Sequence, residues 1–277
     1  MIRTVAETGS TNADMLELAR SGAAEGLWLR AERQVSGRGR QGRAWVAPAG
    51  NLSASTLVRL RATDPQAATL ALVAAVALQE AVEVYLPDPQ NHDVTPDLFR
   101  GPPGGLLRMS GSSGERAAQW TPEQVWGDGG SAARAMLKWP NDLLIAGAKI
   151  SGILLERADD AVVVGIGVNL AAHPDDLERP TTSLAAHGAS PDPAEFLETL
   201  AEAFARWLAR WRGEGLAPIR TRWLERAHPI GTALTARLPD GDAADGLFDG
   251  LDADGALILR LADGQRRVIH AADIFLI

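Results

Sequence analysis

The chain has 277 residues, of which 46% are hydrophobic and 22% charged, a composition typical of a globular protein with one large domain and a smaller one. Its 27 basic and 35 acidic residues give a formal net charge of −8, which argues against broad, phosphate-driven binding to nucleic acid. Because the chain has no cysteine, disulfides, thiolate metal sites and a cysteine nucleophile are excluded.

The start of the chain and its apolar runs predict a cytoplasmic protein that does not associate with membranes. The first seven residues lack the apolar core of a signal peptide. The longest apolar run, residues 67–78, is well short of the ~20 residues that a membrane-spanning helix needs.

The first part of the chain alternates between helical and strand patterns. The predicted elements are a helix at 13–20, strands at 27–34 and 52–60, and a long helix from Asp64-Pro65 to about Val84. Thr11 or Asn12 is the expected cap of the first helix. Residues 87–133 then lack periodicity and are rich in Gly, Pro and Ser, which indicates an insertion.

Regular patterns return after the insertion. They predict a strand at 136–139, a hairpin of 143–145 with 149–155, a strand at 161–168, and helices from Asp192 and over 218–227. From Ile230 onward, short apolar-alternating runs separated by Asp-Gly turns are typical of a small β-barrel. The sequence therefore predicts an α+β domain over residues 1–228, followed by a small β domain over residues 229–277.

Residues 37–43 form a loop rich in glycine and arginine after a predicted strand. Gly37-Arg-Gly-Arg-Gln-Gly42 has the letters of a dinucleotide-binding G-x-G-x-x-G motif, but Pro48 and Gly50 prevent the helix that this motif must begin. A flexible backbone with several guanidinium groups can instead surround an anion such as a carboxylate or a polyphosphate. A solvated basic loop and an RNA-binding tract are the alternatives.

Only two of the 27 basic residues are lysines, Lys138 and Lys149. Because a compact ammonium group fits sites that a planar guanidinium does not, this choice points to a function for both. Lys138 begins the segment Lys138-Trp-Pro-Asn-Asp142, whose proline and Asn-Asp pair also predict an ordinary turn. Lys149 precedes an apolar strand in which Gly152 allows close approach to the backbone.

Five segments, taken together and in order, resemble motifs of the biotin protein ligases. They are Gly9–Asn12, Ala31–Gln34 with Gly37–Arg43, Lys138–Asp142, Lys149–Glu156 and Gly165–Asn169. The resemblance implies a catalytic domain with the α+β fold of class II aminoacyl-tRNA synthetases and a C-terminal SH3-like barrel. It covers nearly the whole chain except residues 87–133.

The resemblance also implies a reaction. ATP and biotin would form biotinyl-5′-AMP and pyrophosphate, and the biotinyl group would then pass to a lysine of a biotin carboxyl carrier protein. This chemistry needs positioning and charge neutralisation rather than a protein nucleophile. Mg²⁺ is expected with the ATP, held mostly by phosphates and water. The five histidines lack the spacing of metal ligands, so no protein-bound metal is expected.

The resemblance divides the site residues between biotin and ATP. The biotin side would be Ser10, Thr11, Asn12, Gln34, Arg38, Gly39, Arg40, Lys149 and Gly152, and the ATP side Arg40, Arg43, Trp45, Lys138, Asn141 and Asn169. Two of them would be catalytic. Arg40 would bridge the biotin carboxylate and the α-phosphate, and Lys149 would contact the carboxyl oxygen of biotin.

Two features depart from the family pattern. The first motif begins by Glu7, which leaves no room for the winged helix of family members that repress transcription, so we expect neither DNA binding nor a repressor role. His270-Ala-Ala-Asp273 stands in place of the usual Ser-Gly-Glu-like turn. We expect a monomer or weak homodimer. The alternative functions are a lipoate–protein ligase of the same superfamily and a nucleic-acid-binding module that uses the Gly-Arg loop.

Overall fold

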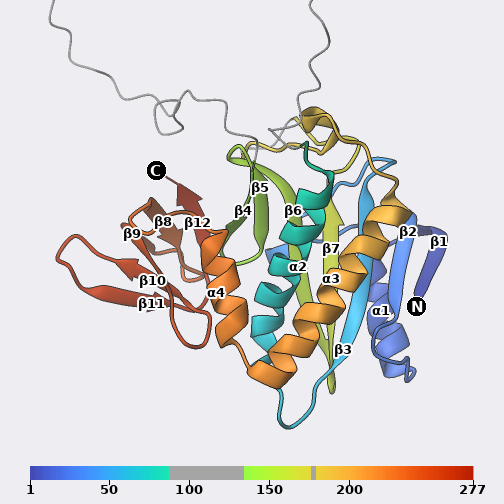
Figure 1. Ribbon diagram of the computed structural model, residues 1–277, viewed down its shortest axis with the longest axis horizontal. Coiled ribbons are helices and arrows are strands. Elements are labelled where there is room, and N and C mark those ends of the chain that lie inside the picture. Colours follow the sequence, from blue (N-terminus) through green and yellow to red (C-terminus); the bar gives the residue numbers. More distant parts are fainter. Residues whose placement is uncertain (88–133, 176–178, 277) are drawn as a thin grey trace, which may run out of the picture. The chain divides into compact units, whose positions relative to one another are not determined.

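The computed structural model describes residues 1–87, 134–175 and 179–276, so the expected insertion, apart from Pro87, lies outside the described residues. Twelve strands and four α-helices form this part of the chain (Figure 1). The strands are β1 (Ile2–Thr8), β2 (Trp28–Gln34), β3 (Leu52–Arg59), β4 (Ala135–Lys138), β5 (Asp142–Ile145), β6 (Ala148–Ala158), β7 (Ala161–Val168), β8 (Ala233–Arg237), β9 (Ala243–Leu251), β10 (Leu257–Arg260), β11 (Arg266–Ile269) and β12 (Asp273–Leu276). The helices are α1 (Thr11–Arg20), α2 (Leu70–Tyr85), α3 (Pro193–Glu214) and α4 (Ala217–Glu225).

The strands form two sheets that follow each other in the chain. The first has seven strands in the order β1-β2-β3-β7-β6-β5-β4, and the second has five in the order β11-β10-β9-β8-β12. Strands β1 and β2 pair in parallel, and the neighbours in the rest of both sheets pair antiparallel. The predicted α+β fold class is confirmed, and a small β domain follows α4. The predicted domain boundary at 228/229 falls in the link between α4 and β8.

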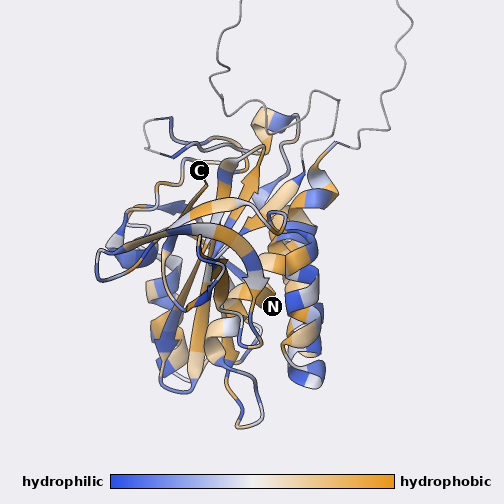
Figure 2. Cartoon of the chain, turned by 90° about the vertical axis from the view of Figure 1, so that its left-hand side faces the viewer, coloured by the Kyte–Doolittle hydropathy of each residue, from blue (hydrophilic) through white to orange (hydrophobic). Residues whose placement is uncertain are grey.

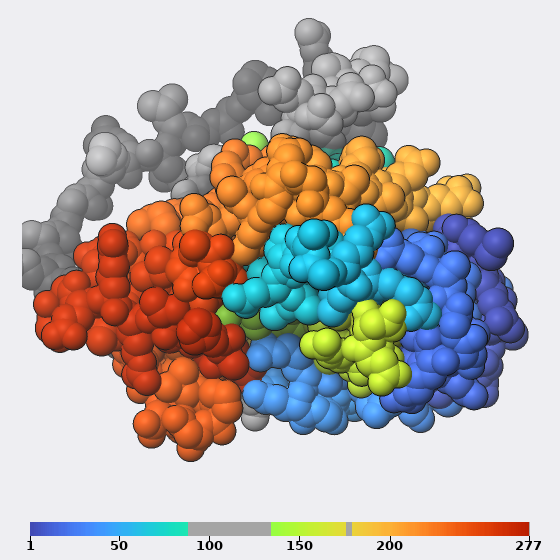
Figure 3. All heavy atoms as spheres, turned by 90° about the horizontal axis from the view of Figure 1, so that it is seen from below, coloured from blue at the N-terminus to red at the C-terminus, as the bar shows by residue number. Residues whose placement is uncertain are grey.

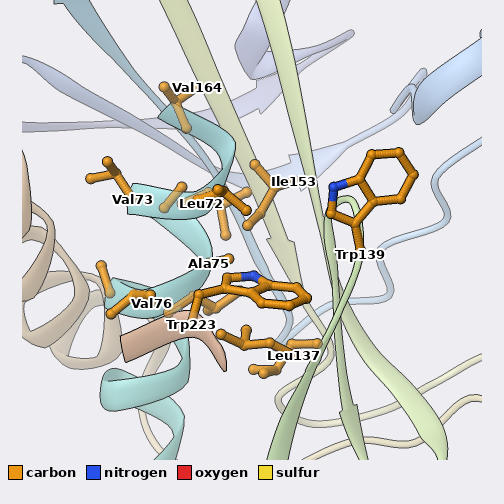
Figure 4. Close-up of a cluster of buried hydrophobic side chains, with 14 of the residues drawn as sticks. Leu72, Val73, Ala75, Val76, Leu137, Trp139, Ile153, Val164 and Trp223 are labelled. Atoms are coloured by element: carbon orange, nitrogen blue, oxygen red, sulfur yellow. The ribbon is translucent and has the colours of Figure 1, made fainter. Parts of the chain in front are cut away.

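Helix α2 fills the core on one face of the seven-stranded sheet. Eleven of its 16 residues are buried, and it packs against strands β4 to β7 and against α3 (Figure 1). Leu72 and Ala75 of α2 lie near Ile153 of β6 and Leu137 of β4 (Figure 4). The helical span 67–85 extends past the apolar run 67–78 and is, by length and composition, long and apolar enough to cross a membrane. In this fold most of that span is buried, as expected for a core helix.

The predicted start of α2 at Asp64-Pro65 is wrong. A 3-10 turn, η2 (Ala67–Thr69), comes first, and α2 begins only at Leu70. Asp64 does not cap the helix, because its carboxylate lies 3.3 Å from the guanidinium of Arg212 on α3. The same guanidinium also pairs with Glu25 at 2.5 Å. Arg212 lowers the pKa of Glu25 below its ordinary value by donating hydrogen bonds to it. A long-range ion cluster therefore overrides a local capping pattern.

Helix α1 covers the other face of the sheet. Met15 of α1 packs with Leu29, Leu57 and Val163, whose side chains point away from α2. The helix cap is Ser10, whose hydroxyl accepts a hydrogen bond from Ala13 N, and not Thr11 or Asn12 as predicted. Because the helix begins at Thr11, two residues before the predicted start, Thr11 and Asn12 lie inside its first turn and are buried. Figure 2 shows hydrophobic residues concentrated along the strands, between these layers.

The second sheet packs against the end of the first through aromatic residues. Trp139 donates from its indole nitrogen to Gly255 O at 3.1 Å, and the rings of Trp223 and Phe248 lie 6.4 Å apart, edge to face. One buried cluster contains hydrophobic side chains of both sheets. In Figure 3 the C-terminal strands, in red, lie against the described remainder of the chain. This packing places the β8–β12 edge beside the turn between β4 and β5.

Candidate functional site

A cavity of about 660 Å³ lies where the two sheets meet. It is surrounded by the start of α1, the loop after β2, the β4–β5 turn, strands β6 and β7, and the β8–β12 edge. All fourteen residues that the resemblance assigned to biotin or ATP line it. The sequence thus identified the residues of one cavity, while the role of each residue stays a prediction.

Buried hydrogen bonds fix the polar corner at the start of α1. Thr11 N donates to Gln34 Oε1 at 2.9 Å. Asn12 Nδ2 donates to Glu156 Oε2 at 2.8 Å, and the Ser55 hydroxyl lies 2.7 Å from Asn12 Oδ1. Because both ends of its amide have partners, Asn12 is held in one orientation. This corner can present hydrogen-bonding groups to a neutral polar ligand without rearranging.

Glycines leave the floor of the cavity without side chains. Gly152 of β6 pairs in register with Gly167 of β7, and the indole of Trp45 lies over Gly167. A Cβ atom at Gly165 would come within 3.0 Å of the side chain of Asn12. The floor is therefore open to a flat ligand or to the Trp45 ring, which supports the close approach predicted at Gly152.

Lys149 stands at this floor with its ammonium group held by a carboxylate. Its Nζ atom lies 2.6 Å from Oδ1 of Asp142, which is only 8% exposed. The backbone of Lys149 is fixed as well, since its N–H donates to Pro180 O at 2.8 Å and its carbonyl accepts from Thr182 N at 2.9 Å. Lys149 therefore presents a positive charge at a fixed place beside the glycine floor.

The Gly-Arg loop reaches across the cavity to the β4–β5 turn. Arg40 Nη1 donates to Asn141 Oδ1 at 3.3 Å, and Asn141 Nδ2 donates to Ile153 O at 2.6 Å. Asn141 thus positions Arg40 in this structure, in addition to its predicted place beside ATP. The loop contains only a short 3-10 turn, η1 (Arg40–Gly42), with no α-helix after it. The predicted lack of a helix after this loop is confirmed.

Asp273 of the second sheet lies beside three arginines, two from the Gly-Arg loop and one, Arg179, from the segment after β7. It pairs with Arg43, and its carboxylate oxygens lie 4.0 Å from Arg40 and 4.0 Å from Arg179. Burial alone would raise the pKa of Asp273, but the hydrogen bond and charge of Arg43 outweigh it and hold that pKa below its ordinary value. Asp273 is therefore ionised at neutral pH and joins the Gly-Arg loop to the second sheet.

Lys138 and His228 lie buried where the two sheets meet, 9% and 7% exposed. Burial lowers the pKa of Lys138 to about 8, and burial together with the nearby Lys138 charge lowers the pKa of His228 to about 4. His228 is thus neutral at pH 7. Lys138 lines the cavity as a partly desolvated cation, and such a cation gains more from an incoming anion than a solvated one does.

The low pKa of His228 predicts a loss of stability in acid. In the unfolded chain the imidazole of His228 takes up a proton near pH 6.5, but in the folded protein it does so only near pH 4. The free energy of unfolding is therefore unaffected by His228 above pH 6.5 and falls as the pH drops toward 4. The full loss is about 3 kcal/mol. Urea unfolding between pH 7 and 4 measures it. His228→Asn should flatten this pH dependence, whereas the exposed-site control His270→Asn should leave it unchanged.

A buried asparagine that no sequence motif marked shapes the turn after β7. Asn51 Oδ1 accepts from three successive backbone N–H groups, those of residues 170, 171 and 172, at 3.1, 3.0 and 3.1 Å. Its Nδ2 donates to Ala172 O at 2.8 Å and lies 3.4 Å from Asn169 Oδ1. Asn169 Nδ2 donates to Thr182 O at 3.0 Å. Asn51 therefore fixes both the turn and the Asn169 side chain.

The charge of the cavity is opposite to that of the whole chain. Seven basic side chains line it, against the two carboxylates of Asp142 and Asp273. Within the described residues, no group of three or more His, Asp or Glu side chains could hold a metal ion. The cavity can therefore bind a polyanion and a carboxylate next to a neutral polar group. A signal for Asp142 was present in its motif, and Asp273 ends a segment noted only as a departure from the family pattern, but nothing local marked Asn51, Arg179 or Arg237.

Comparison with known sequences gives two family matches. Residues 6–170 match the biotin/lipoate A/B protein ligase family, and residues 230–277 match the biotin protein ligase C-terminal domain. A biotin--[acetyl-CoA-carboxylase] ligase of Paracoccus denitrificans is 39% identical over 282 residues, which cover 98% of each chain. One of Mycobacterium tuberculosis is 32% identical, covering 98% of this chain and 86% of its own.

Solved structures share the fold at low identity. The biotin protein ligase from Aquifex aeolicus in complex with biotin and ATP matches with a TM-score of 0.74 and 20% identity, covering 100% of this chain and 99% of that one. The biotin protein ligase from Leishmania major in complex with biotinyl-5-AMP matches with a TM-score of 0.59 and 21% identity, covering 98% of each chain. At these identities the structures establish a common fold.

Proposed function

This chain belongs to the biotin protein ligase family, and from that premise we propose that it activates biotin as biotinyl-5′-AMP and transfers the biotinyl group to a lysine of a biotin carboxyl carrier protein. The observation that carries the proposal is the cavity, in which Lys149 and Arg40 flank a floor of glycines and a fixed polar corner. The solved relatives with biotin and ATP, and with biotinyl-5-AMP, support the same two substrates and intermediate.

The first step needs charge neutralisation more than it needs a nucleophile. A biotin carboxylate oxygen attacks the α-phosphorus of ATP, an O–P bond forms, and pyrophosphate leaves with the electron pair of the broken P–O bond. Lys149 and Arg40 would bring the two anions together, which otherwise repel each other. Their fixed partners, Asp142 and Asn141, would hold them in place before the ligands arrive.

The second step breaks the mixed anhydride. The neutral amine of the carrier lysine attacks the acyl carbon of biotinyl-AMP, an amide forms, AMP leaves, and the amine gives up a proton. The cavity must keep water from the anhydride in the meantime. The Gly-Arg loop is placed for this, since Arg40 and Arg43 join it to the second sheet through Ala272 and Asp273.

We expect Mg²⁺ to enter as a complex with ATP. The two carboxylates of the cavity, Asp142 and Asp273, already pair with Lys149 and Arg43, so they are poor candidates for metal ligands. Phosphate oxygens and water would then hold the ion, as is usual for Mg²⁺ at nucleotide sites. Excess chelator should abolish ATP turnover without lowering the thermal stability of the protein.

Biotin-dependent ATP–pyrophosphate exchange tests the proposal directly. Radiolabelled pyrophosphate should enter ATP when biotin is the added acid, and much less when lipoate replaces it. Adding a purified carrier domain should then give a product heavier by one biotinyl group, and the carrier with its acceptor lysine changed to arginine should not react. Exchange with lipoate alone would instead support the lipoate–protein ligase alternative.

We further propose that the enzyme is not a transcriptional repressor. Its net charge of −8 opposes contact with DNA, and the basic side chains of the Gly-Arg loop line the cavity. Mobility-shift assays with genomic fragments should show no specific complex, with or without biotin and ATP. A complex whose affinity falls steeply with salt would support the nucleic-acid-binding alternative.

Loss of the Asn51 side chain should weaken ATP binding and leave biotin binding unchanged. In Asn51→Ala, three successive backbone N–H groups lose their acceptor and Asn169 loses a neighbour on the predicted nucleotide side. We expect the affinity for ATP to fall about tenfold, measured by calorimetry. Thr56→Val, which removes one side-chain hydrogen bond from the adjoining strand β3, is the control for general destabilisation. Equal losses of affinity for biotin and for ATP would contradict a role of Asn51 in positioning the nucleotide side.

ATP use should decline in alkaline solution because of Lys138. Its pKa of about 8 means that the cation is lost as the pH rises through that value, well before an ordinary lysine would lose it. Since kcat/KM reports the free enzyme, kcat/KM for ATP should fall about tenfold between pH 8 and 9.5. Lys138→Arg, which stays charged, should give a lower but flatter profile over the same range.

A further inference from the structure

Two guanidinium groups lie on the ring of Phe275, at the β8–β12 edge of the cavity. The guanidinium carbon of Arg179 is 4.2 Å from the ring centroid, and that of Arg237 is 4.3 Å from it. Arg237 and Phe275 come from paired strands, in which Arg237 lies opposite Asp273. Arg179 comes from the segment that pairs with Lys149 through Pro180 and Thr182. Three separate segments thus meet at one aromatic ring.

This arrangement leaves the donors of both arginines available. Among the residues the structure describes, neither guanidinium donates a hydrogen bond to the protein, and the carboxylate that pairs with Arg179 is Asp273, at 4.0 Å. Asp273 is already engaged by Arg43. A guanidinium beside an aromatic ring is restrained in orientation but keeps its N–H groups for other partners. Arg179, Arg237 and Phe275 all line the cavity.

The shared ring places two positive charges on one side chain. Arginines that share one ring repel each other, and with Arg40 and Arg43 nearby the β8–β12 edge carries four guanidinium groups against one carboxylate. A bound polyanion would remove this repulsion. Lys138 and Lys149 lie on the first sheet, so the second sheet adds a separate source of positive charge to the same cavity.

We propose that Arg179 and Arg237, held by Phe275, bind the β- and γ-phosphates of ATP and then the pyrophosphate that leaves. This inference rests on the proposed function. When the biotin carboxylate attacks the α-phosphorus, the electron pair of the breaking P–O bond moves onto the α,β-bridging oxygen of ATP, which becomes a terminal oxygen of pyrophosphate. Two guanidinium groups beside that oxygen and its neighbours would stabilise the leaving group, and no proton has to be transferred.

The experiment uses Arg179→Gln, Arg237→Gln, the double variant and Phe275→Leu in the full-length enzyme. Calorimetry with Mg²⁺ pyrophosphate and the KM for ATP in the exchange assay are the readouts. Each single arginine variant should lower the affinity for pyrophosphate and raise the KM for ATP about tenfold, and the double variant should change both quantities more. Phe275→Leu, which keeps both charges but removes the ring, should show a smaller loss. Biotin affinity should stay unchanged in all four.

Two controls distinguish phosphate binding from a general loss of charge or of carrier binding. Arg267→Gln, on the far strand β11 of the second sheet, removes an exposed arginine and should behave like the unmodified enzyme. Transfer from preformed biotinyl-AMP to the carrier should be normal in every variant, since pyrophosphate has left by then. Normal pyrophosphate and ATP constants in the double variant would overturn the inference. So would a defect confined to the KM for the carrier. Lack of exchange in the unmodified enzyme would overturn the proposed function instead.

Discussion

Replacing Lys149 by arginine should abolish most biotin adenylation although the charge is kept. The ammonium group fits between Asp142 Oδ1, at 2.6 Å, and the ring of Trp45, whose centroid is 5.8 Å away. A guanidinium is longer and broader, so it would displace Trp45 or break the contact with Asp142. Removing one well-placed donor to a developing charge costs about 10² to 10³ in rate, and we expect biotin-dependent pyrophosphate exchange to fall by that factor.

The controls for Lys149→Arg must separate geometry from charge. Arg267→Lys makes the reverse exchange at an exposed site and should leave the rate unchanged. Asp142→Asn keeps the size of the carboxylate but removes its charge, so Lys149 loses its anchor, and we expect an intermediate loss of rate. Exchange by Lys149→Arg at more than half the unmodified rate would show that the charge alone is sufficient. Lys149 would then have no special place in the reaction.

Most of the elements could be predicted because their signals are local. The hairpin between β5 and β6 has positive φ at Ala146 and Gly147, as its turn sequence indicates. Asp192 caps α3 through bonds to Ala194 N and Glu195 N, the pattern expected from Asp-Pro-Ala-Glu. The predicted cap of α1 and the predicted start of α2 were wrong. At α2 a distant partner, Arg212, engages Asp64, and no sequence window contains both residues.

The residues of the cavity also divide into those with a local sequence signal and those that act through distant partners. Motifs marked the fourteen residues because each lies in a run of unusual composition, such as the Gly-Arg loop or the Lys-Trp-Pro-Asn-Asp turn. Asn51 and Asp273 act through partners far away in the sequence, residues 170–172 and Arg43, so the residues next to them indicate neither role. Arg237 and Phe275 lie in strands whose alternating pattern also predicts plain surface residues. The contribution of the second sheet could therefore emerge only from the fold.

Charge shows why composition alone is a weak guide to ligands. The chain carries a net charge of −8, yet the nine charged side chains that line the cavity are seven basic and two acidic. Acidic residues elsewhere reduce attraction to long polyanions such as DNA, whereas the cavity attracts a small one. A net charge thus excludes a class of extended partner without excluding a nucleotide. The same acidic exterior agrees with the absence of DNA binding that we propose.

A methyl group at Gly165 should disrupt the biotin side of the cavity. The Cβ atom of Gly165→Ala would lie within 3.0 Å of Asn12 Oδ1, Cγ and Nδ2. Asn12 cannot move aside cheaply, because Glu156 and Ser55 hold both ends of its amide at 2.8 and 2.7 Å. Overpacking at such a place costs about 1–3 kcal/mol, so biotin affinity measured by calorimetry should fall about ten- to hundredfold.

The position of Gly165 on β7 makes this test specific. Gly213→Ala, on α3 where a Cβ meets no atom within 4 Å, should leave biotin affinity unchanged and match the unmodified stability or exceed it. Gly165→Ala combined with Asn12→Ala should recover the stability lost by the single change, because the smaller side chain makes room, but not biotin affinity. Recovery of both would mean that Asn12 only fills space. If neither recovers, the strand itself rather than Asn12 requires glycine at this position.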